Sequence, residues 1–175
     1  MSIDLHCHTR YSDGSTPLEE LIQLAALRGV TTFALTDTIP WRAANARWSL
    51  GGERRDGDSR VEISAADPKR HGKAHILCYK PKKPEVLLPL LQKTTDSRHA
   101  AMLRSVDKVC RLYAIPREMI LRRAEGSTNI YKQHVLQALM DAGYASEMFG
   151  EVFKKLYDSK TGIATRRWII PTSIP

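Results

Sequence analysis

The sequence predicts an α/β protein, because a strand, a helix and a second strand follow one another within the first 35 residues. Ile3–Leu5 is a short apolar run that predicts a buried strand. Val30–Leu35, with the sequence VTTFAL, is rich in the β-branched and aromatic residues typical of strands. Two such strands joined through a helix form a βαβ unit, which implies a parallel sheet. The composition becomes helical from about Pro81 onward, which predicts a separate all-α region.

The predicted first helix carries signals at both ends. Pro17 suits the first helical position, Thr16 is a candidate N-cap, and Glu19 and Glu20 lie in the first turn, where the helix dipole favours acids. Gly29 is expected to end the helix, because glycine readily adopts the left-handed conformation that follows a helix.

Two further strands and several helices follow. The segment VEIS at 61–64 and the segment AHILCYK at 74–80 predict strands. Helix-like apolar stripes are present in Val86–Leu91, Ala101–Leu112, Arg117–Ala124, Val135–Ala142 and Glu147–Tyr157. We therefore expect a sheet-containing part over residues 1–80, a helical subdomain over 81–160 and an irregular tail over 161–175.

Composition favours a globular cytoplasmic protein. Hydrophobic residues make up 42% of the chain and charged residues 26%, and no apolar run approaches the length of a membrane span. The predicted first strand begins at Ile3, so we expect no signal peptide. Three cysteines without CxxC spacing favour reduced thiols. The net charge of +8 favours an anionic partner such as a nucleotide or RNA, although a mildly basic soluble protein is the plain alternative. No protein partner can be inferred.

Two histidines at the end of the first strand are the main candidates for chemistry. His6 and His8 point to the same side of a strand, whereas Cys7 points to the other side, where core packing explains it best. Two imidazoles presented together suit Zn, Mn or Fe, and Asp13 can add an oxygen ligand after the turn at Gly14. The alternative is that His6 is a buried, hydrogen-bonded histidine and that Asp13 is a turn residue.

Four further residues are candidates from their positions. Glu62 lies between apolar neighbours in a predicted strand and His75 lies in the next one. A buried carboxylate or imidazole needs a partner, and a shared metal would satisfy both. Lys132 and His134 precede a helix, where a cation, an imidazole and backbone N–H groups can bind phosphate. Capping and surface roles are the alternatives for this second pair.

The first block of the sequence resembles the PHP (polymerase and histidinol phosphatase) superfamily. DLHCHTRYSDGSTPLEELIQLAALRGVTTFALTD, residues 4–37, is similar to that family's DLHxHTxxSDGxxxPxELxxxAxxxGxxxxAxTDHD. VEIS, HILCYK and the helical segments IYKQHVLQALMDAGYA and EVFKKLY resemble later regions of one branch, over residues 61–163. That branch contains 3′,5′-nucleoside-bisphosphate phosphatases and RNase AM-type 5′–3′ exoribonucleases.

The resemblance implies a fold, a metal cluster and a reaction. The fold would be the N-terminal part of a distorted (β/α)7 barrel, left incomplete here, with an α-helical insertion subdomain. The family has three divalent ions, usually Mn, Fe or Zn, and hydrolyses phosphate esters. Carried over by position, His6 and His8 would bind one ion, Asp13 would complete part of the cluster, Glu62 would bridge ions and His75 would bind a neighbouring one. Lys132 and His134 stand where the branch has phosphate contacts.

The chain departs from the family after Asp37. The family has Asp-His-Asp-Thr-Val-Ala-Gly where Asp37–Ala43 reads DTIPWRA, so the ligand histidine is replaced by Thr38. Deleting one C at the Asp–His junction of a coding sequence for the family motif gives this stretch. We therefore expect residues 38–60 to be translated out of frame and irregular, with a divergent loop as the alternative. The early stop is likewise expected to be a truncation.

These departures leave two functional hypotheses. The first is a PHP-type metal-dependent phosphoesterase acting on 3′,5′-bisphosphonucleosides or RNA 5′ ends. The second is a catalytically inactive remnant with at most weak metal or RNA binding, because Thr38 and the early stop remove ligands that the family uses.

Overall fold

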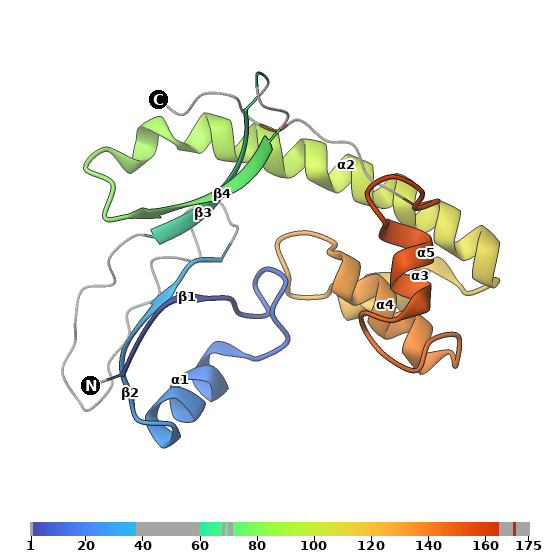
Figure 1. Ribbon diagram of the computed structural model, residues 1–175, viewed down its shortest axis with the longest axis horizontal. Helices are drawn as coiled ribbons and strands as arrows, with labels where there is room; N and C mark the ends of the chain where they lie inside the picture. Colours follow the sequence, from blue (N-terminus) through green and yellow to red (C-terminus); the bar gives the residue numbers. More distant parts are fainter. Residues whose placement is uncertain (1, 38–59, 68, 70–71, 165–169, 171–175) are drawn as a thin grey trace. The chain divides into compact units, whose positions relative to one another are not determined.

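The computed structural model describes residues 2–37, 60–67, 69, 72–164 and 170. All of the described strands lie within residues 2–79, together with one helix, and the elements after β4 are helices (Figure 1). The expected out-of-frame segment at 38–60 lies outside the described residues except for its last residue, and most of the expected irregular tail lies outside them too. The elements in order are β1 (Ser2–Cys7), α1 (Leu18–Leu27), β2 (Val30–Leu35), β3 (Arg60–Asp67), β4 (Gly72–Tyr79), the 3-10 helix η1 (Pro84–Val86), α2 (Leu88–Tyr113), α3 (Arg117–Arg123), α4 (Lys132–Asp141) and α5 (Glu151–Tyr157).

The α/β class is confirmed, and so is the parallel βαβ unit. β1 pairs with β2 in parallel, with Ile3 opposite Thr32 and Cys7 opposite Leu35. β3 and β4 form a separate antiparallel pair, in which Glu62 lies opposite Leu77. Among the described residues these are two two-stranded sheets.

Two details of the first βαβ unit differ from the expectation. β1 is not buried, since Ile3 is 57% exposed and Leu5 50% exposed. The reason is that, in the described part of the chain, β2 is the only strand that pairs with β1. The N-cap of α1 is Pro17 rather than Thr16, and it makes no side-chain capping bond. The helix does end as expected, with Gly29 in the left-handed region at φ +70°.

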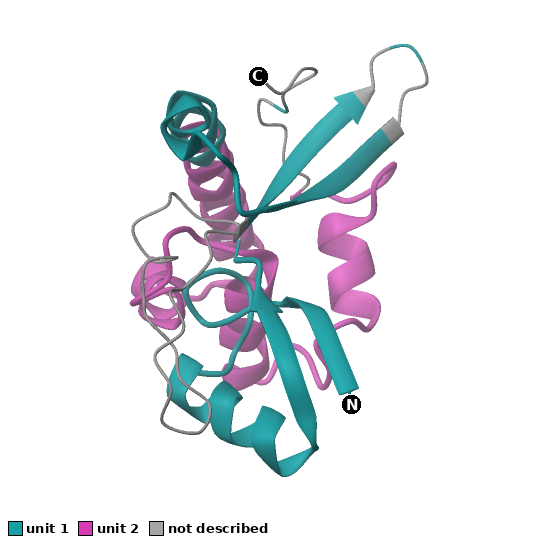
Figure 2. Cartoon of the chain, turned by 90° about the vertical axis from the view of Figure 1, so that its left-hand side faces the viewer, with its two compact units in different colours: residues 1–95, 170–175 teal, residues 96–169 magenta. Residues whose placement is uncertain are grey.

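The chain divides into two compact units, which Figure 2 shows in different colours. Unit 1 comprises residues 1–95 and 170–175, and unit 2 comprises residues 96–169. The division falls inside α2. This single 26-residue helix spans parts of two of the predicted helical segments. The domain boundary that we expected at residue 80 lies directly after the end of β4 at Tyr79. Its role as a domain boundary stays a prediction.

Unit 1 has a small apolar core on one face of the β3–β4 pair. Side chains alternate along a strand, so Val61 and Ile63 point to one side and Glu62 to the other. Val61 and Ile63 are 5% and 3% exposed and pack with Leu87 and Leu91, from the chain that leads into and begins α2. This packing fixes which face of β3 carries the polar side chains.

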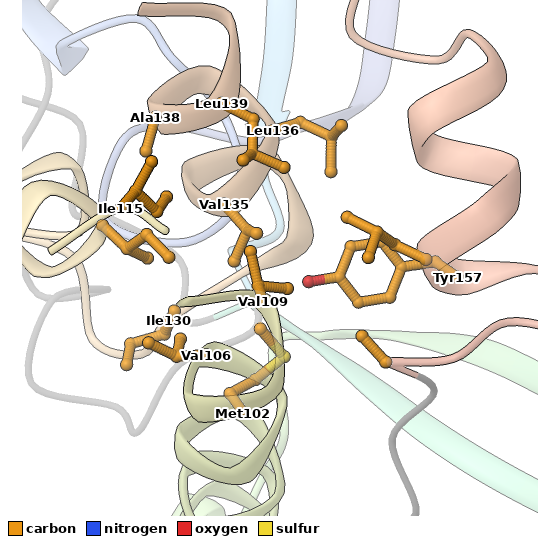
Figure 3. Close-up of a cluster of buried hydrophobic side chains, with 13 residues drawn as sticks. Met102, Val106, Val109, Ile115, Ile130, Val135, Leu136, Ala138, Leu139 and Tyr157 are labelled. Atoms are coloured by element: carbon orange, nitrogen blue, oxygen red, sulfur yellow. The ribbon is translucent and has the colours of Figure 1, made fainter. Parts of the chain in front are cut away.

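Unit 2 has a larger core formed by its helices. Figure 3 shows these side chains meeting between the helices, with α2 contributing Met102, Val106 and Val109. Leu139 and Leu136 come from α4 and are fully buried, as is Ile120 of α3. A buried hydroxyl pair completes the core, because Ser105 Oγ lies 3.2 Å from Tyr157 Oη and donates to the carbonyl of Ala164.

Every helix in the described residues is too short or too polar to cross a lipid bilayer.

Leu139→Ala tests the core of unit 2. The substitution removes a fully buried side chain and leaves a cavity, so we expect the free energy of unfolding to fall by about 2–5 kcal/mol. Urea denaturation followed by circular dichroism measures this loss. Leu112→Ala is the matched control on α2, where the side chain is 51% exposed, and it should cost about 0.5 kcal/mol or less. Equal losses for the two variants would contradict this assignment of the core.

Candidate metal centre

The loop that follows β1 is built on close backbone contacts. The carbonyl of Thr9 accepts the N–H groups of Ser12 and Gly14, at 3.0 and 3.1 Å. Gly14 is needed there because a Cβ on it would lie 2.6 Å from the carbonyl oxygen of His8. The loop therefore folds back on the end of β1 and brings Asp13 next to His8.

The parallel register brings the end of β2 to the same place. The backbone N–H of Thr36 donates to the carbonyl of Cys7 at 2.8 Å, which continues the pairing beyond Leu35. Asp37 then lies beside the loop after β1, as expected for the carboxyl ends of neighbouring parallel strands.

His6, His8 and Glu62 form a group with the geometry of a metal site. One ligand atom from each of these residues lies within 4.8 Å of the other two. The Nε2 atoms of His6 and His8 are 3.0 Å apart. Glu62 Oε1 lies 3.5 Å from His6 Nε2, and its Oε2 lies 3.7 Å from His8 Nε2. Two imidazoles and a carboxylate suit Zn, Mn or Fe.

His75 approaches the same carboxylate from β4. Its Nδ1 lies 2.8 Å from Glu62 Oε1, and its side chain is 59% exposed. Glu62 itself is 6% exposed, so three imidazoles surround a buried carboxylate. Glu62 and His75 therefore contact each other directly, while their role as metal ligands stays a prediction.

Asp13 faces the other nitrogen of the His8 ring. Its Oδ1 lies 3.0 Å from His8 Nδ1, whereas Nε2 of the same ring belongs to the His6–Glu62 group. The two ring nitrogens point in different directions, so in this arrangement Asp13 orients the ring through Nδ1 and leaves Nε2 to the His6–Glu62 group. A direct ligand role for Asp13 stays a prediction from the sequence.

The contact between His8 and Asp13 shifts the pKa values of both groups. The hydrogen bond that the His8 ring donates to Asp13 raises the pKa of His8 above its ordinary value of 6.5, although burial opposes the shift. Burial alone would raise the pKa of Asp13, but the hydrogen bond and the charge of His8 outweigh it and lower this pKa below 3.8. The contribution of His8 to stability is complete below pH 6.5 and is lost as the pH rises through its folded pKa. That of Asp13 is complete above pH 3.8 and is lost as the pH falls through its folded pKa.

Cys7 is partly buried, and its role in core packing stays a prediction. Burial raises the pKa of the Cys7 thiol to about 11, with the nearby charge of Asp4 adding to the effect. A thiol with this pKa is protonated at neutral pH and is a poor nucleophile or metal ligand. All three cysteines are thiols rather than disulfides.

Lys132 and His134 have structural contacts within unit 2. His134 Nδ1 accepts the backbone N–H of Tyr131 at 3.2 Å, which caps the start of α4. The Lys132 ammonium lies over two aromatic rings, 5.2 Å from the centroid of Phe153 and 5.6 Å from that of Tyr157. These contacts match the capping and surface alternatives, and the phosphate role stays a prediction.

The sequence alone did not identify the residues whose hydrogen bonds fix the loop after β1. Thr9 and Ser12 are fully buried, and both donate to the carboxylate of Asp37. A signal was present, since Asp37 directly follows a strand that runs parallel to β1, but its partners depend on how the loop folds.

Comparison with known proteins agrees with this geometry. Residues 4–81 match the PHP domain family, which confirms over this part of the chain the resemblance seen in the sequence. A phosphoribosyl 1,2-cyclic phosphate 1,2-diphosphodiesterase from Eggerthella lenta is 33% identical over 159 residues, which cover 88% of this chain and 60% of that protein.

Two solved structures share the fold. A structure described as a metal-dependent phosphoesterase from Bifidobacterium adolescentis matches 98% of this chain with a TM-score of 0.79 at 21% identity. An amidohydrolase from Chromobacterium violaceum, with bound sulfate and no metal, matches 97% with a TM-score of 0.74 at 27% identity. This chain spans 60% of the length of each of these relatives.

Asp13→Asn tests the origin of the His8 pKa. The asparagine keeps the shape but removes the charge, so the pKa of His8 should fall, because the burial that lowers it remains. An NMR titration of the His8 ring measures the change. Glu19→Gln is the control, because it also removes one negative charge, but from an exposed position on α1. It should leave the titration of His8 unchanged. A His8 pKa that is the same in wild type and Asp13→Asn would contradict the assigned cause.

Proposed function

We propose that this chain belongs to a metal-dependent phosphoesterase of the PHP type. The observation that carries the proposal is the His6–His8–Glu62 group, formed at the end of β1 and within β3 in the segment that matches the PHP domain. We further propose that the described strands are the N-terminal part of a (β/α)7 barrel. The fold shared with a structure described as a metal-dependent phosphoesterase supports this interpretation.

The donor set fits a divalent ion. His6 and His8 each present Nε2 to a common point, and Glu62 contributes a carboxylate whose burial favours a cationic partner. Three protein ligands leave a coordination position open, which is typical of catalytic rather than structural sites. A divalent ion bound there would stabilise charge on a phosphoryl group and lower the pKa of water. His75, at 2.8 Å from Glu62, would orient the carboxylate or bind a neighbouring ion.

The substrate that we propose is a phosphate ester of a nucleotide, either a 3′,5′-bisphosphonucleoside or an RNA 5′ end. The net charge of +8 supports an anionic substrate. The Eggerthella lenta relative is named for a cyclic phosphodiester of phosphoribose, which makes that compound the main competing substrate.

A second candidate function is metal binding without turnover. Thr38 stands where the resembling family has a histidine ligand, and a threonine hydroxyl is a weaker ligand than an imidazole. Losing one ligand reduces the control over ion spacing, and errors of about 1 Å in position can lower a rate roughly a hundredfold.

Metal binding tests the site without assuming turnover. We expect His8→Ala and Glu62→Gln each to weaken Mn²⁺ or Zn²⁺ binding by about tenfold or more, as measured by isothermal titration calorimetry, because each removes one of three donors. His99→Ala is the control, since His99 is an exposed histidine of unit 2. The affinity of the wild-type chain for the metal ion should also decrease as the pH is lowered, because protons then compete for His8, whose pKa lies above 6.5. Binding unaffected by both substitutions would reject the site.

Hydrolysis assays separate the two candidate functions. The purified chain is incubated with Mn²⁺ and, in turn, adenosine 3′,5′-bisphosphate, a 5′-phosphorylated RNA and phosphoribosyl 1,2-cyclic phosphate. Turnover of one of the first two that is lost in His8→Ala would support the proposed substrate class. Turnover of the cyclic ester alone would replace that class by the one named for the relative. Metal binding without turnover of any substrate would favour the second candidate.

A further inference from the structure

Asp37 accepts three hydrogen bonds from the loop that carries His8. Its Oδ1 accepts the backbone N–H of Thr9 at 2.7 Å and the hydroxyl of Ser12 at 2.6 Å, and its Oδ2 accepts the hydroxyl of Thr9 at 2.7 Å. Thr9 and Ser12 are fully buried. Hydrogen bonds to a carboxylate are about twice as strong as bonds between neutral groups, so these bonds determine where the loop lies.

The same bonds determine the direction of the Ser12 hydroxyl. Ser12 has one hydroxyl proton, and its neighbours include acceptor atoms of Asp37, His8 and Asp13. Asp37 Oδ1 is the nearest of these three atoms at 2.6 Å, whereas His8 Nδ1 lies at 3.2 Å and Asp13 Oδ1 at 3.3 Å. The proton therefore points to Asp37, and the Ser12 oxygen offers only its lone pairs to His8.

His8 Nδ1 consequently faces two acceptors. The Ser12 oxygen lies 3.2 Å from this nitrogen, and Asp13 Oδ1 lies 3.0 Å from it. A ring nitrogen that faces two acceptors carries the proton, and in a neutral imidazole the other nitrogen then keeps its lone pair. That other nitrogen is Nε2, which belongs to the group formed with His6 and Glu62.

We infer that Asp37 is a positioning residue of the candidate metal centre, which acts through Ser12 to hold His8 in the Nδ1–H tautomer. The Nε2 lone pair would then be available to a bound ion. The use made of this lone pair rests on the proposed function, whereas the tautomer is a property of the protein alone. Loss of such a supporting partner typically reduces metal affinity 10- to 100-fold.

The tautomer of His8 provides the first test. We expect ¹⁵N NMR of the imidazole nitrogens, in the metal-free full chain at a pH where His8 is neutral, to show the Nδ1–H form in wild type. Asp37→Ala releases the Ser12 proton toward Nδ1, so the share of the Nε2–H form should rise. Asp37→Asn, a neutral and weaker acceptor, should give a smaller rise. Thr9→Val is the matched control, because it removes one bond to Asp37 but leaves the Ser12 bond, and it should keep the wild-type tautomer.

A double-mutant cycle identifies the route of the effect. In a Ser12→Ala background the competing hydroxyl is absent, so substituting Asp37 should no longer change the tautomer. If Asp37→Ala does not fold, the comparison of Asp37→Asn with Ser12→Ala/Asp37→Asn decides the same point. An Nε2–H form in wild type, an unchanged tautomer in the Asp37 variants, or a change that persists without Ser12 would overturn the inference.

Zn²⁺ binding by calorimetry separates this inference from the proposed function. Asp37→Ala should weaken Zn²⁺ binding about tenfold or more and Asp37→Asn severalfold, with Thr9→Val closer to wild type. Wild-type chain that shows the expected tautomers but binds no Zn²⁺ would reject the metal site and leave the positioning of His8 intact. Zn²⁺ binding that is equal in wild type and in a folded Asp37→Ala would reject the role of Asp37.

Discussion

The buried carboxylate of Glu62 is the constraint on which the arrangement of unit 1 depends. A charged group removed from water is strongly destabilising unless partners compensate it. Here His6 and His8 come from the end of β1 and His75 comes from β4, so the carboxylate draws together side chains from two separate strand pairs. A divalent cation would be a further compensating partner, because it adds positive charge at the point where two imidazole nitrogens already converge.

The position of Glu62 follows from the alternation of side chains along β3. The neighbours Val61 and Ile63 bury themselves against Leu87 and Leu91, and this hydrophobic contact leaves Glu62 no other face. Substituting either apolar neighbour would thus loosen the polar face indirectly. A small hydrophobic core on one side of a two-stranded sheet is in this way coupled to the candidate metal centre on the other side.

Unit 2 depends on a different balance. Its helices share a core of fully buried aliphatic side chains, with one hydroxyl pair between Ser105 and Tyr157 inside it. The polar residues that the sequence had marked for phosphate, Lys132 and His134, contact an aromatic pair and a helix N-terminus within this unit. Such contacts are sufficient to explain why a cation and an imidazole stand at the start of α4.

Local pattern in the sequence determined much of the architecture. The β-branched run VTTFAL folds as the strand Val30–Leu35, and Gly29 ends the preceding helix, because both features depend on a few consecutive residues. The same reasoning placed His6 and His8 on one side of β1, since a strand alternates its side chains. It failed for the burial of β1, because burial depends on what covers a strand rather than on the strand itself.

Tertiary structure alone decided which atoms meet at the site. The spacing of Asp13 after His8 indicated that the two side chains lie close together, and the tight turn at Gly14 decides that the carboxylate faces Nδ1 of the ring. Likewise, nothing in the order of residues says that the Asp37 carboxylate receives the Ser12 hydroxyl, since 25 positions separate them and only the parallel register of β1 and β2 brings them together. The sequence determined the types of donor and the strands that carry them. The direction of each donor was decided by backbone contacts between segments that are distant in the chain.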